Sequence, residues 1–202
     1  LGLAGDDHHI TQPVDWGELK RTFIMLERLL DGPLIFDSPF VCANLAEIAA
    51  GIGQVLALDL RRSPWHICNS ILNARKERYG DINHFYGARP LDFHSILSEP
   101  DPVVQTVRQA ASLAAETDNG LAALPASHVL QIDYETLRAA PLDSADRVAA
   151  FLTRHGPAPK RKKVEIGPFP DRNAGATVDS VMRDRLDEVF AAYFPGAPIP
   201  PR

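Results

Sequence analysis

The sequence has 202 residues, of which 45% are hydrophobic and 23% are charged, and its formal net charge is −5. This composition is that of a globular domain large enough to bury a core. The negative charge argues against broad nucleic-acid binding, which needs an excess of Lys and Arg. No apolar run reaches the roughly 20 residues of a membrane span. The two cysteines, Cys42 and Cys68, are predicted to be buried free thiols, which fits a reducing, cytoplasmic compartment.

The first part of the chain predicts a helix, a strand and a second helix. Asp15 and Glu18 form a capping-box pattern, and apolar residues at helical spacing follow until Gly32. Residues 34–36 form a short apolar run that predicts a buried strand. Over residues 40–52 the apolar side chains again fall on one helical face. This order is typical of helices packed on a sheet.

The middle of the chain repeats a strand followed by a helix. A buried strand is predicted over 54–60. A serine and a proline at 63–64 then provide a cap and a first-turn proline for a helix that ends at Gly80. Residues 101–102 give a similar start signal for a long helix, and the run 128–133 predicts a third strand. Strands that alternate with helices predict a parallel sheet.

The C-terminal part contains two more helices and a long loop. One helix is expected to open at Asp143, and the last is expected over about 177–193. The loop over 157–175 is rich in Pro, Lys and Arg, and long loops inside compact domains are often functional. Together these patterns predict a single α/β domain over residues 1–202, with a central parallel sheet flanked by helices.

The end of the second predicted strand is the most informative segment. Arg61 and Arg62 end this strand, and the proline-started helix follows at once. Ligands of open parallel sheets bind beyond the carboxyl ends of the strands, and helix N-termini attract anions. Guanidinium groups fit phosphate oxygens. The segment therefore predicts an anion site with phosphate as the expected ligand. The alternative is that both arginines are surface residues paired with carboxylates.

These residues resemble a signature of a known family. Arg62 at a strand end, Pro64 two residues later and Ser70 eight residues after the arginine resemble the 3′-phosphate signature of sulfotransferases that use 3′-phosphoadenosine-5′-phosphosulfate (PAPS). Segments within 70–152 are similar to bacterial members, and the resemblance extends over about residues 13–193. It implies the P-loop nucleotide-binding fold of sulfotransferases and transfer of a sulfonate group from PAPS to a hydroxyl or amine.

The resemblance also implies roles for single residues. Arg62 and Ser70 would hold the 3′-phosphate of the nucleotide. Tyr134 would lie near the adenine, unless it is a core tyrosine. Arg172 and Asn173 would close over the nucleotide from the late loop, unless they belong to a solvated loop end.

The chain departs from the family in two places. The family opens with a strand and a Gly-rich loop that cradles the 5′-phosphosulfate, and residues 1–5 offer no equivalent. The first strand, loop and helix are therefore expected to be cut off or lost. The family also has a lysine directly after the strand predicted at 34–36, where this chain has Asp37. That lysine would stabilise the negative charge on the leaving phosphate, whereas a carboxylate there would repel it. Either another residue stabilises this charge or the activity is weak.

Sulfonate transfer also needs a base that takes the acceptor proton. The candidates are His8, His9, Asp37 and His66, and Asp37 is assigned to the active-site lining. The mechanism requires no metal. Residues 6–9 look like metal ligands, but they have no distant partner in the sequence and are expected to form a flexible polar end.

The acceptor is left open between a small molecule, a glycan, a lipid and a peptide. No nucleic-acid partner and no membrane span are expected, and the oligomeric state is unknown. Phe85, Tyr86, Phe93 and His94 either line the acceptor pocket or form a separate hydrophobic cluster.

Two alternatives to an active sulfotransferase stay open. A kinase on the same fold would need a Gly-Lys-Ser/Thr loop and a carboxylate that binds Mg²⁺ after a strand. A non-catalytic relative would bind a nucleotide or a protein partner without transferring a group. The absent Gly-rich loop and Asp37 both favour this second alternative.

Overall fold

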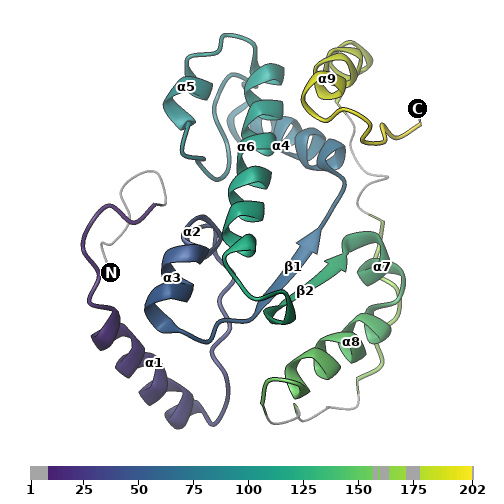
Figure 1. The fold of residues 1–202 in the computed structure, drawn as a ribbon. Coiled ribbons are helices and arrows are strands. Elements are labelled where there is room, and N and C mark those ends of the chain that lie inside the picture. Colours follow the sequence, from purple (N-terminus) through teal and green to yellow (C-terminus); the bar gives the residue numbers. More distant parts are fainter. Residues whose placement is uncertain (1–8, 157–158, 160–163, 172–177, 202) are drawn as a thin grey trace.

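The structure is a computed structural model that describes residues 9–156, 159, 164–171 and 178–201. These residues form helices around a two-stranded parallel sheet (Figure 1). The predicted α/β class and the parallel sheet flanked by helices are therefore confirmed. Across the described ranges, no helix combines the length and the apolar character that a membrane crossing requires.

The sheet consists of β1 (Ala57–Arg61) and β2 (Val129–Asp133), which run parallel with Arg61 opposite Asp133. Between the strands the chain passes through α4 (Pro64–Tyr79), α5 (Phe93–Leu97), α6 (Pro102–Ala122) and a 3₁₀ turn (Ala126–His128). Parallel strands need such a crossover. Because the carboxyl ends of both strands lie at one edge, the residues that follow Arg61 and Asp133 meet there (Figure 1).

The main core lies between α4, α6 and α9 (Ser180–Tyr193), which gather in the upper part of Figure 1. Trp65 and Leu72 of α4 pack in one cluster with Val107 of α6 and with Leu186 and Phe190 of α9. Each of these side chains is at most 1% exposed. Full burial of a large apolar side chain stabilises the fold by about 1.5–3 kcal/mol, so this cluster holds the crossover helices in place.

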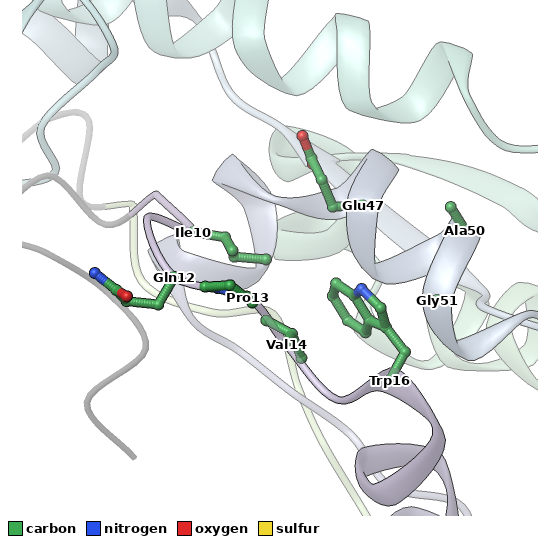
Figure 2. A pocket seen from close by; sticks show the side chains of 8 residues that line it. All are labelled: Ile10, Gln12, Pro13, Val14, Trp16, Glu47, Ala50 and Gly51. Atoms are coloured by element: carbon green, nitrogen blue, oxygen red, sulfur yellow. The ribbon is translucent and has the colours of Figure 1, made fainter.

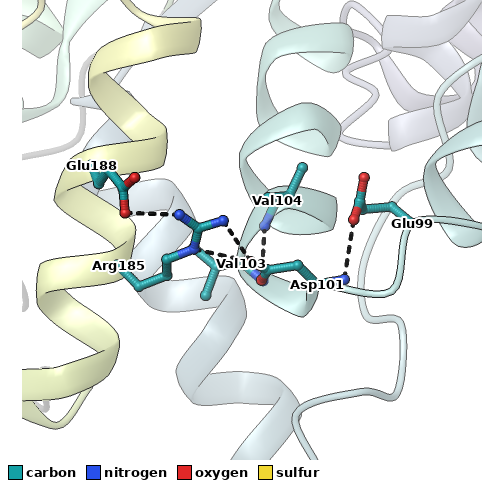
Figure 3. Close-up of polar contacts among 6 residues, drawn as sticks. All are labelled: Glu99, Asp101, Val103, Val104, Arg185 and Glu188. Carbon is teal, nitrogen blue, oxygen red and sulfur yellow. Dashed lines mark hydrogen bonds and ion pairs between the residues drawn. The ribbon is translucent and has the colours of Figure 1, made fainter.

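A polar network also fixes α9 to the start of α6 (Figure 3). Asp101 caps α6 by accepting a hydrogen bond of 2.8 Å from the Val103 N–H. Its second oxygen lies 2.9 Å from the Arg185 guanidinium of α9, which also contacts Glu188 at 2.7 Å. Desolvation raises the pKa of Asp101, but the hydrogen bonds from Val103 and Arg185 outweigh it and hold the pKa below its ordinary value.

The remaining helices lie around the lower half of the molecule in Figure 1. They are α1 (Trp16–Leu30), α2 (Pro39–Ala43), α3 (Leu45–Ile52), α7 (Tyr134–Ala139) and α8 (Pro141–Thr153). The predicted cap of α1 is present, since Asp15 accepts a hydrogen bond of 2.8 Å from the Glu18 N–H. None of the α1 side chains is buried among the described residues, so α1 is held at the periphery of the fold.

Three predictions from the first part of the chain are wrong. Residues 34–36 form no strand, and Ile35 is 85% exposed. The helix expected over 40–52 is broken at Asn44, whose amide donates to the Phe40 carbonyl and accepts from the Ile10 N–H. Such side-chain bonds compete with the helical ladder. Cys42 is exposed, whereas Cys68 is a buried free thiol as expected, and burial raises its pKa to about 12.

The later elements follow the predictions more closely. The helix after β1 ends at Gly80, which adopts the left-handed conformation with φ 67°. The helix expected from Asp143 begins two residues earlier, at Pro141. The last helix begins at Ser180. Asp179 caps it, because its side chain accepts a hydrogen bond from the Met182 N–H.

Candidate functional site

Two adjacent arginines at the end of β1 have different surroundings. The Arg61 guanidinium forms ion pairs of 2.6 Å with Asp59 and 2.5 Å with Asp118 of α6. For Arg61 the alternative of pairing with carboxylates therefore holds. Arg62 points elsewhere, because its guanidinium carbon lies 5.1 Å from the centroid of the Tyr134 ring. Neighbouring residues of an extended chain face opposite ways, which explains the difference.

Tyr134 is the first residue of α7 and follows β2 directly. The preceding residue, Asp133, caps α7 by accepting a hydrogen bond of 2.9 Å from the Thr136 N–H. The parallel register therefore brings Arg62 and Tyr134 together at the carboxyl edge of the sheet. A cation over an aromatic face is worth about 0.5–1 kcal/mol at an exposed site and more when desolvated. The contact orients the guanidinium at the edge where parallel sheets bind ligands.

His66 and Ser70 lie one helical turn apart on α4. Residues at this spacing share a helix face, about 6 Å apart along the axis. The opposite face of α4 carries the buried Trp65, Cys68 and Leu72. Ser70 is exposed and His66 is half-buried. The Arg62 charge is one of the charges that act on the His66 ring.

The pKa of His66 is lowered. Desolvation is the largest cause, and the positive charges of Arg62 and Arg183 lower it further. The carboxylates of Glu135 and Asp171 act in the opposite direction but do not prevail. The His66 imidazole is thus under the influence of two cations, from the end of β1 and from α9, and of two carboxylates, from α7 and from the late loop.

The late loop is anchored on both sides of this edge. On one side, the Phe169 N–H donates to the Arg138 carbonyl at 2.9 Å, and the Arg138 guanidinium lies 3.5 Å from Asp171. On the other side, the Val178 N–H donates to Asn69 of α4 at 3.2 Å. Sequence reasoning missed these anchors, because nothing in the sequence pairs residues from such distant segments.

Two predicted site residues, Arg172 and Asn173, lie outside the described residues, as does the candidate base His8. The described loop residues end next to α7 and resume next to α4. The role of Arg172 and Asn173 in closing over a nucleotide remains a prediction. His9 lies 3.8 Å from Glu116 of α6 and is largely buried there.

Asp37 lies at the start of α2, next to the capping residue Ser38. The pKa of the partly desolvated Cys42 thiol is raised by burial first, and then by the carboxylates of Asp37 and Asp59. The assignment of Asp37 to the active-site lining remains a prediction.

The aromatic-rich loop packs on the crossover helices. The rings of Phe85 and Phe93 meet edge to face at 4.8 Å. The guanidinium of the buried Arg75 lies over the Phe85 ring at 5.3 Å, and that of Arg78 lies over Tyr86 at 5.1 Å. These contacts favour the hydrophobic-cluster interpretation of the loop.

A separate groove of about 440 Å³ lies between the N-terminal segment and α3 (Figure 2). Figure 2 shows the Trp16 ring against α3, with Glu47 at the rim. The lining is apolar apart from Gln12 and Glu47, and no predicted site residue belongs to it. The groove is therefore distinct from the Arg62 edge. Among the described residues, no group of three or more acidic, His or Cys side chains could hold a metal ion.

Comparison with known proteins gives one structural neighbour and a distant sequence relative. A sulfotransferase domain from the curacin biosynthetic pathway superposes with a TM-score of 0.52 at 17% identity, covering 91% of this chain and 63% of that domain. The 2-aminoethylphosphonate–pyruvate transaminase of Pseudomonas aeruginosa, found in two strains, is 28% identical over 71% of this chain and 37% of its own length. No family model matches the chain.

The structural neighbour shows that the fold is that of a sulfotransferase domain, as the sequence predicts. The chain spans less than two thirds of that domain and little more than a third of the transaminase.

Proposed function

We propose that this chain is part of a sulfotransferase that uses PAPS, and that it holds the 3′-phosphate of the nucleotide. The observation that carries the proposal is the Arg62 guanidinium over Tyr134, at the carboxyl edge of a parallel strand pair and directly before α4. A phosphate at this position would meet a planar guanidinium and the positive end of the α4 dipole. The fold of the structural neighbour supports the same function.

Each predicted ligand has a distinct part in this proposal. Arg62 provides charge and paired hydrogen bonds, and Ser70 donates its hydroxyl from the exposed face of α4. Tyr134 orients Arg62 and offers its half-buried ring to the adenine side. Arg172 and Asn173 would add contacts from the loop anchored at Asp171 and Val178.

In the reaction, an acceptor oxygen or nitrogen attacks the sulfur of PAPS while the bond from sulfur to the phosphate oxygen breaks. Adenosine 3′,5′-bisphosphate leaves with that electron pair, and the acceptor proton passes to a base. The residues around Arg62 fix the nucleotide and so align the sulfur with the acceptor. We assign Asp37 to the lining where the acceptor proton is taken.

The proposal predicts that Arg62→Ala weakens the binding of adenosine 3′,5′-bisphosphate by about 10- to 150-fold. This corresponds to the loss of about 1.5–3 kcal/mol from hydrogen bonds to a charged phosphate. Ser70→Ala should weaken binding about fivefold, since a hydroxyl contributes about 1 kcal/mol. Isothermal titration calorimetry measures both dissociation constants.

Two matched variants serve as controls. Arg28→Ala removes an exposed guanidinium at the end of α1, and Ser98→Ala removes an exposed hydroxyl after α5. Both should bind like the unchanged chain. Unaltered binding by Arg62→Ala would contradict the proposal. A labelled-sulfate transfer assay then shows whether the protein is an active enzyme or only binds the nucleotide. Nucleotide binding without transfer to any acceptor class supports the non-catalytic alternative.

Amino-group transfer is a second candidate, because the sequence relative is a 2-aminoethylphosphonate–pyruvate transaminase. A phosphonate is an anion that Arg62 could also bind. The transaminase match covers 71% of this chain, whereas the sulfotransferase superposition covers 91%. Incubation with 2-aminoethylphosphonate and pyruvate tests this candidate, since amino transfer would produce alanine.

A further inference from the structure

His66 has no hydrogen-bond partner at Nδ1 among the described residues, although this atom is buried. Its ring meets the Trp65 ring edge to face at 5.3 Å and 89°. Trp65 is itself fixed, because its indole N–H donates to Asp187 of α9 at 2.7 Å. The imidazole is therefore oriented by the core while one buried nitrogen is unsatisfied. Buried polar atoms are almost always hydrogen-bonded, so this nitrogen is one of the few in the described residues that a bound ligand could satisfy.

The position of His66 points to the phosphate that Arg62 and Ser70 are proposed to hold. It lies four residues after Arg62 and four before Ser70, in the first turn of α4. His66 and Ser70 share one helix face, and the Arg62 charge acts on the imidazole. A phosphate held by both Arg62 and Ser70 would therefore lie on the helix face that carries His66.

Four charged residues from four different parts of the chain act on His66. Arg62 at the β1 end and Arg183 of α9 disfavour a proton on the ring, while Glu135 of α7 and Asp171 of the late loop favour one. Desolvation and the two cations dominate, so the free site holds a neutral imidazole at neutral pH. A phosphate dianion would reverse this balance, because it brings two negative charges next to the ring.

We propose that His66 is a third ligand of the phosphate held by Arg62 and Ser70, and that it takes up a proton as the nucleotide binds. This inference rests on the proposed function. It assigns to His66 a role in binding that makes nucleotide affinity depend on pH. The affinity for the nucleotide should rise as pH falls. The total rise should be about tenfold if binding raises the pKa of His66 by one unit, and about a hundredfold if it raises this pKa by two.

Calorimetry of adenosine 3′,5′-bisphosphate binding in two buffers of different ionisation enthalpy tests the proposal. At pH 7 a phosphate monoester is mostly dianionic, with a second pKa of about 6, and the Arg62 guanidinium favours the dianion further, so proton uptake on binding reports on the protein. The unchanged chain should take up a measurable fraction of a proton per nucleotide. His66→Gln should take up none. His94→Gln, which removes an exposed imidazole of α5, should behave like the unchanged chain.

The affinities give a second readout. At pH 6 the unchanged chain should bind the bisphosphate about tenfold more tightly than His66→Gln, and at pH 8 the two should agree within about twofold. Adenosine 5′-phosphate, which lacks the 3′-phosphate, should bind both chains equally at either pH. The proton count in the unchanged chain needs no variant, so a folding defect in His66→Gln cannot hide the result.

The outcomes separate this inference from the proposed function. If the unchanged chain binds the bisphosphate and Arg62→Ala does not, but no proton is taken up and His66→Gln binds normally at pH 6, the role of His66 is overturned and the proposed function stands. If the unchanged chain does not bind the bisphosphate at all, both are overturned. Proton uptake that disappears in His66→Gln supports both.

Discussion

Among the glycines that the structure describes, Gly51 is the one at which an added Cβ would meet the closest atoms. It lies in α3 beside the Trp16 ring (Figure 2). A Cβ at this position would lie 2.1 Å from Cδ2 and 2.3 Å from Cε3 of Trp16. No side chain occurs at such distances, so the indole would have to leave its place on α3. The missing side chain of Gly51 is thus what lets the start of α1 pack on the rest of the fold.

We expect Gly51→Ala to destabilise the protein by about 1–3 kcal/mol, the usual effect of overpacking. Urea unfolding measures the free energy, and the tryptophan emission should shift because Trp16 becomes exposed. Gly167→Ala is the matched control, since a Cβ there meets no atom within 4 Å. Equal stability of the two variants would mean that Trp16 does not pack on α3 as described.

The sequence predicts the surroundings of some site residues but not of others. The two arginines at a strand end, directly before a proline-started helix, predicted an anion site, and the structure places Arg62 over Tyr134. The surroundings of His66 were not predictable, because Arg183 is more than 100 residues away and carries no local signal. Capping and periodicity act over a few residues, whereas electrostatic contacts depend on the tertiary fold.

Among the elements, α6 and α9 are linked by the side chain of Asp101. Asp101 caps α6 and binds Arg185 of α9 (Figure 3). Asp101→Ala should lose both contacts and cost about 1–3 kcal/mol. Asp101→Asn should keep most of the cap, since Asn is a good capping residue, and lose only the charge pairing. Thermal unfolding of the two variants separates the two contributions.

The same residue predicts a pH dependence. The folded pKa of Asp101 lies below its ordinary value of 3.8, so its contribution is fully present above pH 3.8 and is lost as pH falls through the folded pKa. Chemical unfolding between pH 2 and pH 6 should show a steeper acid loss for the unchanged chain than for Asp101→Asn. Parallel curves would show that the Arg185 contact does not stabilise the fold.

Elements differed in how well the sequence predicted them. The helix after β1 carries a first-turn proline and a terminal glycine, and both ends were predicted correctly. The apolar run 34–36 has the composition of a strand, but a strand also needs a neighbour to pair with, and composition cannot supply one. The break at Asn44 depends on its bond to Ile10, which lies 34 residues earlier in the chain.

For the whole molecule, burial is uneven. The α4–α6–α9 cluster contains side chains with no exposure, whereas none of the described α1 side chains is buried. Local stability follows the number of buried apolar contacts. We expect amide hydrogens of α1 to exchange orders of magnitude faster than those in the middle of α6, as measured by hydrogen exchange with mass spectrometry. Equal protection would show that α1 unfolds only together with the core.

Arg61 and Arg62 point in opposite directions. This limits the insertions and deletions that the connection between α3 and β1 can tolerate. Side chains of a strand alternate, so gaining one residue just before Ala57, with the preceding chain fixed, would shift the register of β1 by one and turn every β1 side chain to the other face. Arg61 would then take the place beside Tyr134, and Asp118 would lose its partner. Losing one residue would instead move Arg62 to the place of Arg61. Insertions or deletions of two residues preserve the facing. Natural length variation at this connection is therefore expected in even steps.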